Sequence, residues 1–138
     1  MREDAAGGGW VWVARSMAAG AAYDLVFAIA ILGFLRPAAR LLALEPPADP
    51  TYLRLNGVFL IVLALMYLLA AARPARYQGV VFVAVIARGL GAAYFAAVAR
   101  LGPGPASTFL ALGSVDLAFA LLHATLLVRA KAADRASV

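Results

Sequence analysis

The chain has no cysteine among its 138 residues, and its only histidine is His123. The absence of cysteine excludes disulfides, thiolate nucleophiles and cysteine-ligated zinc or iron–sulfur sites. A single histidine argues against a histidine-rich metal site and against haem ligation by two imidazoles. We therefore expect neither a metal nor a cofactor in this protein.

Charged side chains are also scarce. They make up 14% of the chain, whereas a soluble domain carries about a quarter. Hydrophobic residues make up 65%, so there is too little polar surface to cover a water-soluble globule. The composition places the chain in a membrane, and its length leaves room for one domain, residues 1–138, with no separate soluble part.

Four apolar stretches are long enough to cross a bilayer as α-helices, which takes about 20 residues each. They cover residues 17–35, 51–72, 77–99 and 107–128, and arginine, proline and glycine separate them. The stretches are continuous and rich in alanine and leucine, whereas the strands of a membrane barrel alternate apolar and polar residues. The sequence predicts an all-α fold, an integral membrane bundle of four transmembrane helices.

The segments outside these stretches are short. Residues 1–9 are charged and then glycine-rich, which predicts disorder, and the polar tail after residue 128 is expected to fray. The connection 37–50 holds four prolines, and its residues 38–44 are predicted to form one or two helical turns in the membrane interface. No cleavable signal peptide is recognised, so the first stretch is expected to remain as a span.

Basic residues favour one end of the predicted bundle. Four spans place both termini on one side, which holds Arg2, Arg15, Arg73, Arg76, Arg129, Lys131 and Arg135. The other side holds Arg36, Arg40, Arg100 and, at the start of the second span, Arg54. Cytoplasmic loops are enriched in Lys and Arg, so both termini are expected in the cytoplasm, with the protein in the inner membrane of a bacterium. This bias accounts for the net charge of +5, and nucleic acid is not expected as a partner.

Several polar side chains fall inside the predicted spans, where an ionised group costs roughly 2.5–3.5 kcal/mol to insert. Such groups are expected to face the bundle interior and to have partners. If they carry chemistry, the catalytic candidates are Asp24, Asp116 and His123. The binding candidates are Asn56, Arg88, Tyr67, Tyr94 and Arg54. Alternatively, the guanidinium of Arg54 extends to the nearby interface.

The depth of each candidate follows from the helical rise of about 1.5 Å per residue. Arg88 and Asp116 fall near the middle of the membrane, which predicts a salt bridge between them. Asp24 and His123 fall at a common depth nearer the cytoplasm, which predicts a hydrogen-bonded pair. Asn56 is expected to join from the second span. The simpler alternative is that the salt bridge between Arg88 and Asp116 has only a structural role and holds two helices together.

The first and fourth spans share a short string. Asp24-Leu25-Val26-Phe27-Ala28 matches Asp116-Leu117-Ala118-Phe119-Ala120 at four of five positions. The second and third spans share the pattern Arg-x-x-Gly, which begins at Arg54 and at Arg88. This order is that of an inverted repeat, as found in transporters. Chance is the alternative, because leucine, alanine and phenylalanine are abundant in any membrane helix.

The chain resembles the DoxX-like superfamily of small four-helix bacterial membrane proteins over roughly residues 20–129. The similarity lies in hydropathy, in the Arg54-Leu55-Asn56-Gly57 opening of the second span, in the basic turn 71–76 and in the third span with Arg88 and Gly91. It implies a fold of four membrane helices. Because the family has no single activity, the resemblance assigns no catalytic residue.

Three functions are compatible with these residues. The first is a buried site that binds or converts a lipophilic small molecule, as an isomerase or cyclase would, with Asp24, Asp116 and His123 as acid and base. The second is a non-catalytic accessory subunit that packs against a partner membrane protein. The third is a small proton-coupled transporter that works as a homodimer. Membrane lipid is a partner in all three, and the convergence of ionisable groups favours the first.

Overall fold

The computed structural model of the protein describes the backbone of residues 3–136 and the side chains of residues 8–136. These residues form five α-helices and no strand: α1 (Glu3–Gly33), α2 (Leu35–Leu41), α3 (Thr51–Ala72), α4 (Gln78–Leu101) and α5 (Ala106–Ala136). All except α2 are long and apolar enough to cross a bilayer. The prediction of an all-α bundle of four transmembrane helices is confirmed, and the chain is a multi-pass membrane protein.

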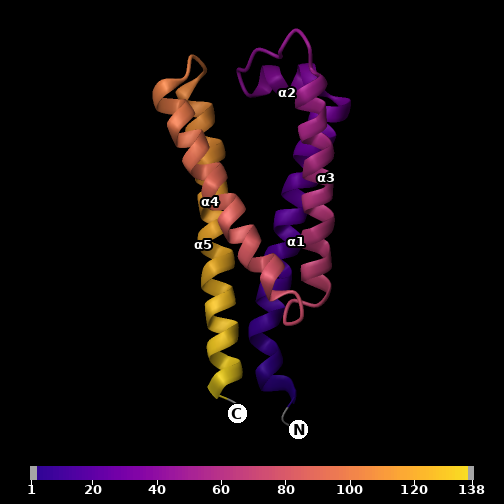
Figure 1. Ribbon diagram of the computed structural model, residues 1–138, viewed down its shortest axis with the longest axis vertical. Helices are drawn as coiled ribbons and strands as arrows, with labels where there is room; N and C mark the ends of the chain where they lie inside the picture. Colours follow the sequence, from indigo (N-terminus) through magenta and orange to yellow (C-terminus); the bar gives the residue numbers. More distant parts are fainter. Residues whose placement is uncertain (1–2, 137–138) are drawn as a thin grey trace.

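The long helices form two antiparallel pairs, α1 with α3 and α4 with α5 (Figure 1). At the end that holds both termini the pairs come together, and α1 packs against α5. At the other end, which carries α2 and the turn between α4 and α5, the pairs diverge. Helix α4 slants between them, so its N-terminal end lies near α3 and its C-terminal end lies away from it.

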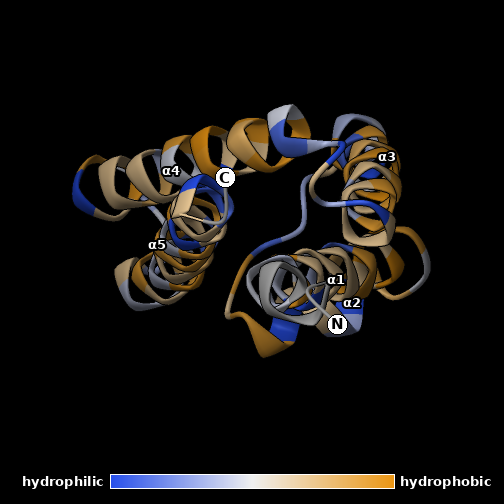
Figure 2. Cartoon of the chain, turned by 90° about the horizontal axis from the view of Figure 1, so that it is seen from below, coloured by the Kyte–Doolittle hydropathy of each residue, from blue (hydrophilic) through white to orange (hydrophobic). Residues whose placement is uncertain are grey.

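The outward faces of the helices are apolar. Val26 on α1, Leu65 on α3, Leu90 on α4 and Leu121 on α5 are all more than half exposed, and hydrophobic residues colour much of every long helix in Figure 2. Lipid tails are as apolar as leucine, so these faces contact membrane lipid.

We call the half of the bundle that carries both termini the closed half and the other the open half. The closed half holds a continuous apolar core. Its fully buried members include Val13 and Met17 of α1, Ala64 of α3 and Val81 of α4, and Leu127 of α5 packs with them. Small residues allow the close approach of helices that lipid-embedded packing requires. The four long helices are therefore closely packed in the closed half of the bundle.

Helices α1 and α5 extend further toward the ends of the chain than the sequence predicted. Residues 3–9 continue α1 as helix instead of being disordered, and the tail continues α5 to Ala136 instead of fraying after residue 128. The indole N–H of Trp10 donates to the carboxylate of Asp134 at 2.9 Å, so the two helix ends hold each other. Arg2, counted above on the cytoplasmic side, lies outside the described residues.

The connection between the first two spans also differs in detail. Helix α1 ends at Gly33, two residues before the predicted boundary, and α2 begins at Leu35 instead of residue 38. Pro37 therefore lies within the first turn of α2, where its missing N–H breaks no helical hydrogen bond. Other boundaries agree closely: α3 matches the predicted 51–72, and the predicted starts at 77 and 107 each lie within one residue of α4 and α5. The start of the first span and the end of the fourth do not, because α1 begins at Glu3 and α5 ends at Ala136.

Gly113 lies at a close backbone contact between α4 and α5. A Cβ added there would stand 3.1 Å from the Cβ of Phe95 and 3.3 Å from the carbonyl oxygen of Ala92. We predict that Gly113→Ala destabilises the bundle by about 1–3 kcal/mol, because the backbone of α4 has to move.

Gly89 on α4 is the matched control, because nothing lies within 4 Å of a Cβ added there. Gly89→Ala should leave the stability unchanged or raise it by up to about 1 kcal/mol. Thermal unfolding followed by circular dichroism in detergent measures both variants. Equal melting temperatures for the two would show that α4 and α5 are not in this close contact.

Candidate functional site

Arg88 of α4 forms ion pairs with two aspartates from two other helices. Its Nη2 lies 2.6 Å from Oδ1 of Asp24 on α1, and its Nη1 lies 2.7 Å from Oδ1 of Asp116 on α5. All three residues are buried. We call Asp24, Arg88 and Asp116 the charge cluster. The salt bridge predicted between Arg88 and Asp116 is present, and Asp24 is a second partner that the prediction missed.

Aromatic rings surround the guanidinium. Its central carbon lies 5.0 Å from the ring centre of Tyr23, 5.2 Å from that of Phe119 and 5.6 Å from that of Tyr67. A cation over an aromatic face is attracted by the ring quadrupole. Because Tyr67 belongs to α3, all four long helices contribute to the surroundings of Arg88.

The predicted pair between Asp24 and His123 is wrong. Asp24 bonds Arg88, whereas Nδ1 of His123 lies 3.1 Å from Oγ of Ser16. The physical reason is the start of α1: the helix begins before residue 17 and its Val13 is already buried in the core, so Asp24 lies farther from the closed end than the sequence suggested. It lies about 14 Å from the Gly33 end of α1, and Asp116 lies about 15 Å from the Ala106 end of α5.

His123 forms a separate polar contact on the closed side of the charge cluster. Its side chain is fully buried. The hydroxyl of Ser16 donates to the carbonyl of Val13 at 2.9 Å, so Ser16 accepts from His123, whose proton then sits on Nδ1. Along α5, His123 lies about 10 Å from Asp116. It is therefore a neighbour of the cluster and not a member.

The remaining predicted residues lie in different places. Tyr67 is buried against the charge cluster. Asn56 is exposed near the start of α3 but lines the cavity described below. Tyr94 is 67% exposed, its ring packs against Phe95, and Arg54 is also exposed. The structure does not bring Tyr94 or Arg54 to the charge cluster, and exposure of Arg54 fits the alternative in which it extends to the interface.

The two copies of the repeated string meet at one guanidinium. Asp24 and Asp116 begin the matching strings, they come from antiparallel helices, and both bond Arg88. An inverted repeat would place equivalent residues in this way. The other pair breaks the symmetry, because Arg54 is exposed and Arg88 is buried. The repeat stays a prediction.

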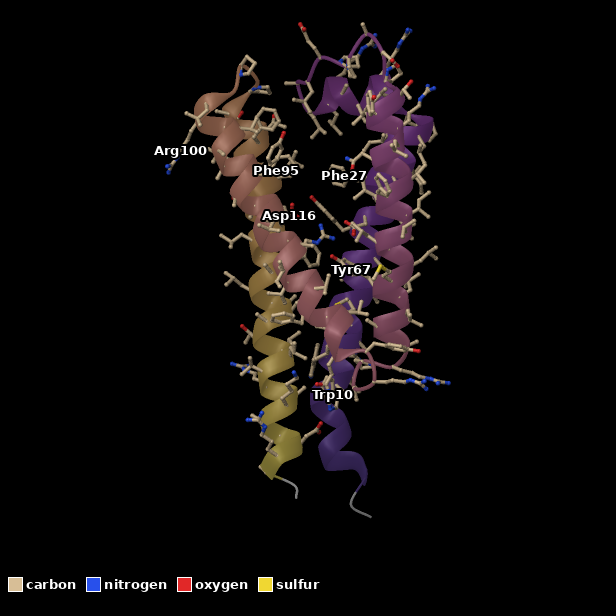
Figure 3. All side chains as sticks on the ribbon, in the orientation of Figure 1. Trp10, Phe27, Tyr67, Phe95, Arg100 and Asp116 are labelled. Atoms are coloured by element: carbon tan, nitrogen blue, oxygen red, sulfur yellow. The ribbon has the colours of Figure 1, made fainter. Side chains whose placement is uncertain are left out.

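A cavity of about 460 Å³ lies in the open half of the bundle, between the two helix pairs. The charge cluster forms its inner end, and α2 with the segment 44–47 covers its outer end. Between these ends the walls are mostly apolar and include Phe27, Ile31, Phe95, Phe109 and Leu112. Figure 3 shows Phe27 and Phe95 on opposite sides of the space between the helix pairs, with Asp116 between them and the closed end.

A second hollow of about 370 Å³ adjoins the cavity. The two share the side chains Tyr23, Phe27, Leu42 and Leu112. Its rim reaches residues with lipid-exposed surface, such as Leu41, Ala111 and Val115. The hydroxyl of Thr108 on α5 donates to the carbonyl of Leu42 at 2.8 Å, which joins the two helix pairs at this point.

The cavity could not be predicted from the sequence. Phe27, Phe95 and Phe109 are indistinguishable from ordinary packing residues of a membrane helix, and only the divergence of the helix pairs turns them into walls. Tyr23 was missed for the same reason, although it stands one position before Asp24. In the described part of the chain no three His, Asp or Glu residues gather in a group that could hold a metal ion.

Fold and site together define a small multi-pass helical membrane protein with a buried charge cluster at the inner end of an apolar cavity. No protein-family model, no curated protein and no solved structure matches the chain. The resemblance to the DoxX-like superfamily therefore stays a prediction.

Arg88 neutralises much of the charge of two buried carboxylates, so its removal should be costly. We predict that Arg88→Met destabilises the protein by about 3–5 kcal/mol, because an uncompensated buried charge remains. The triple variant Arg88→Met, Asp24→Leu, Asp116→Leu should regain most of that loss, since apolar replacements of a whole buried ion cluster are often neutral.

The same substitution at Arg54 is the matched control, because this arginine is exposed on α3. Unfolding in a detergent titration measures all three variants. An Arg88→Met protein as stable as Arg54→Met, or a triple variant no more stable than Arg88→Met, would contradict the structural role assigned to the cluster.

Proposed function

We propose that the protein binds a lipophilic small molecule within the membrane, with the polar group of that molecule at the charge cluster and its apolar body in the cavity. The observation that carries the proposal is the cavity itself. Its volume of about 460 Å³ falls within the roughly 300–1,000 Å³ of small-molecule sites, which combine apolar walls with a few polar groups.

The inner end of the cavity offers hydrogen-bonding capacity. Asp24 and Asp116 each use Oδ1 for Arg88, which leaves both Oδ2 atoms for other partners. Oδ2 of Asp24 is buried with no hydrogen-bond partner among the described residues. A buried polar atom without a partner is costly, and a ligand donor would remove that cost.

The second hollow supports entry from the lipid. It lies beside the cavity, shares four side chains with it and reaches the exposed surface of α5 at Val115. A lipophilic molecule is concentrated in the bilayer, so a sideways route between α1 and α5 supplies it without passage through water. Tyr23 and Phe27 line both spaces.

If the bound molecule is also converted, the acid and base are Asp24 and Asp116. Both line the cavity, whereas His123 does not. A general acid or base must come within hydrogen-bond reach of the proton that it transfers. Of the three catalytic candidates, only the two aspartates therefore keep this role, and His123 does not. The class of reaction that fits the two carboxylates remains that of an isomerase or cyclase.

The cavity also bears on the alternative functions. An accessory subunit needs only a packed bundle, so an apolar cavity that ends on ionised groups favours binding instead. A transporter must open toward both sides of the membrane, whereas here Val13, Met17 and Leu127 fill the closed half. Binding is the function that this single arrangement supports best.

We further propose that the closed half faces the cytoplasm of a bacterial cell. Among the described residues, the closed end carries most of the basic side chains: Arg15, Arg73, Arg76, Arg129, Lys131 and Arg135. Enrichment of Lys and Arg on the cytoplasmic side then puts both termini there. The covered outer end of the cavity lies on the opposite side of the inner membrane.

A photoreactive long-chain alcohol that carries a diazirine tests the binding proposal. With the protein in lipid nanodiscs, we predict that illumination labels cavity residues such as Ile31 and Leu112, which peptide mapping by mass spectrometry identifies. Ala30 lines the cavity, so Ala30→Trp should remove most of these adducts by filling the space.

Ala96 is the matched control, because it is exposed on α4 and does not line the cavity. Ala96→Trp should retain the cavity adducts. Labelling confined to lipid-facing residues in the wild-type protein, or labelling of the cavity that Ala30→Trp leaves unchanged, would refute the proposal.

A further inference from the structure

The charges on the cavity wall are mostly negative. Asp24 and Asp116 form the inner end and Glu45 lies at the outer end, and Arg88 is the one basic residue among the lining residues. With these groups ionised, the wall carries more negative than positive charge. The arginines of α2, Arg36 and Arg40, are exposed and do not line the cavity.

The single positive charge is already engaged. Nη1 and Nη2 of Arg88 bond one carboxylate each, and three aromatic rings lie within 5.0–5.6 Å of its central carbon. Nη2 also donates to the backbone carbonyl of Gly20 at 3.4 Å, and Nε is buried with no partner among the described residues. The face formed by Nη1 and Nη2, which arginine can use to bind a carboxylate or phosphate through two bonds, is therefore occupied by the two aspartates.

Each of the two aspartates, in contrast, has one carboxylate oxygen, Oδ2, that does not bond Arg88. Asp24 is 1% exposed and lines the cavity, and its Oδ2 has no partner in the described part of the chain. Asp116 has used only Oδ1, and its side chain keeps 11% of its surface exposed. A ligand that meets these oxygens must bring donors, and a positive charge on the donor strengthens the bond.

The aromatic walls favour the same kind of ligand. Tyr23, Phe27, Phe95 and Phe109 all line the cavity. Aromatic faces attract ligand cations electrostatically, most strongly where water is excluded. They also form an apolar surface for the rest of the molecule.

We infer that the ligand of this cavity is a lipophilic cation, an amine that is protonated at neutral pH, with its ammonium group at Asp24 and Asp116. The inference rests on the proposed function and names the chemical class of the molecule. The ammonium would donate to the two Oδ2 atoms, and Glu45 would attract the cation at the outer end. A protonated amine satisfies the acceptors at the inner end, whereas an anion would meet like charge.

Three diazirine probes with the same alkyl chain test the inference. They differ only in the polar group, which is a primary ammonium, a hydroxyl or a sulfonate. In nanodiscs of neutral phosphatidylcholine, cavity adducts are counted relative to adducts on lipid-facing residues, which corrects for partitioning. We expect about tenfold more cavity labelling by the ammonium probe than by the sulfonate probe, because the carboxylates repel the sulfonate.

The outcomes separate the two proposals. If no probe labels the cavity, the proposed function itself fails. If the alcohol and sulfonate probes label the cavity as well as the ammonium probe does, binding stands and the preference for a cation is overturned. Repeating the experiment with phosphatidylethanolamine distinguishes the sources of the amine: competition indicates a lipid headgroup, and no competition indicates a free amine.

Glu45→Gln provides a variant that does not disturb the buried cluster, because Glu45 is exposed in the connection before α3. It should lower labelling by the ammonium probe about twofold, the size expected for an exposed charge, and leave the alcohol probe unchanged. Asp49→Asn is the matched control: Asp49 is an exposed acid of the same connection and does not line the cavity. Equal effects of the two substitutions on the ammonium probe would contradict a role for charge on the cavity wall.

Discussion

The ion pairs of Arg88 with Asp24 and Asp116 constrain the rest of the bundle. Ionised groups at membrane depth are tolerated when they meet a partner away from lipid. Here one guanidinium has to reach two carboxylates, so α1, α4 and α5 converge at one level, and Tyr67 brings α3 to the same place. On one side of this level the helices pack closely, and on the other the two pairs diverge around the cavity.

The convergence requires small residues at the crossing points. A Cβ on Gly91 would stand 2.7 Å from Oδ2 of Asp116, and a Cβ on Gly20 would stand 3.2 Å from the ring of Tyr67. Glycine at these positions therefore gives the carboxylate and the ring their space. The same residues that hold the bundle together also form the polar end of the cavity, so the stability of the bundle and the polarity of the cavity depend on one set of side chains.

Hydropathy was sufficient to predict the four transmembrane helices, and the helical rise was sufficient to predict the pair between Arg88 and Asp116. The partner of Asp24 was not predictable in this way, because the first span was predicted to start at residue 17, whereas α1 is already helical and buried at Val13. The cavity could not be predicted from the sequence. It depends on where the helix pairs separate, which is set by contacts between segments far apart in the chain, such as Thr108 with Leu42.

Solid-state NMR of the protein in lipid bilayers tests the central interaction most directly. With ¹⁵N in the arginine side chains and ¹³C in the aspartate carboxylates, we expect dipolar contacts from the guanidinium of Arg88 to two carboxylate carbons. The substitutions Asp24→Asn and Asp116→Asn should each change the signal of one of these two carboxylate carbons. A guanidinium in contact with only one carboxylate, or with neither, would show that Arg88 does not join α1 and α5 in the bilayer.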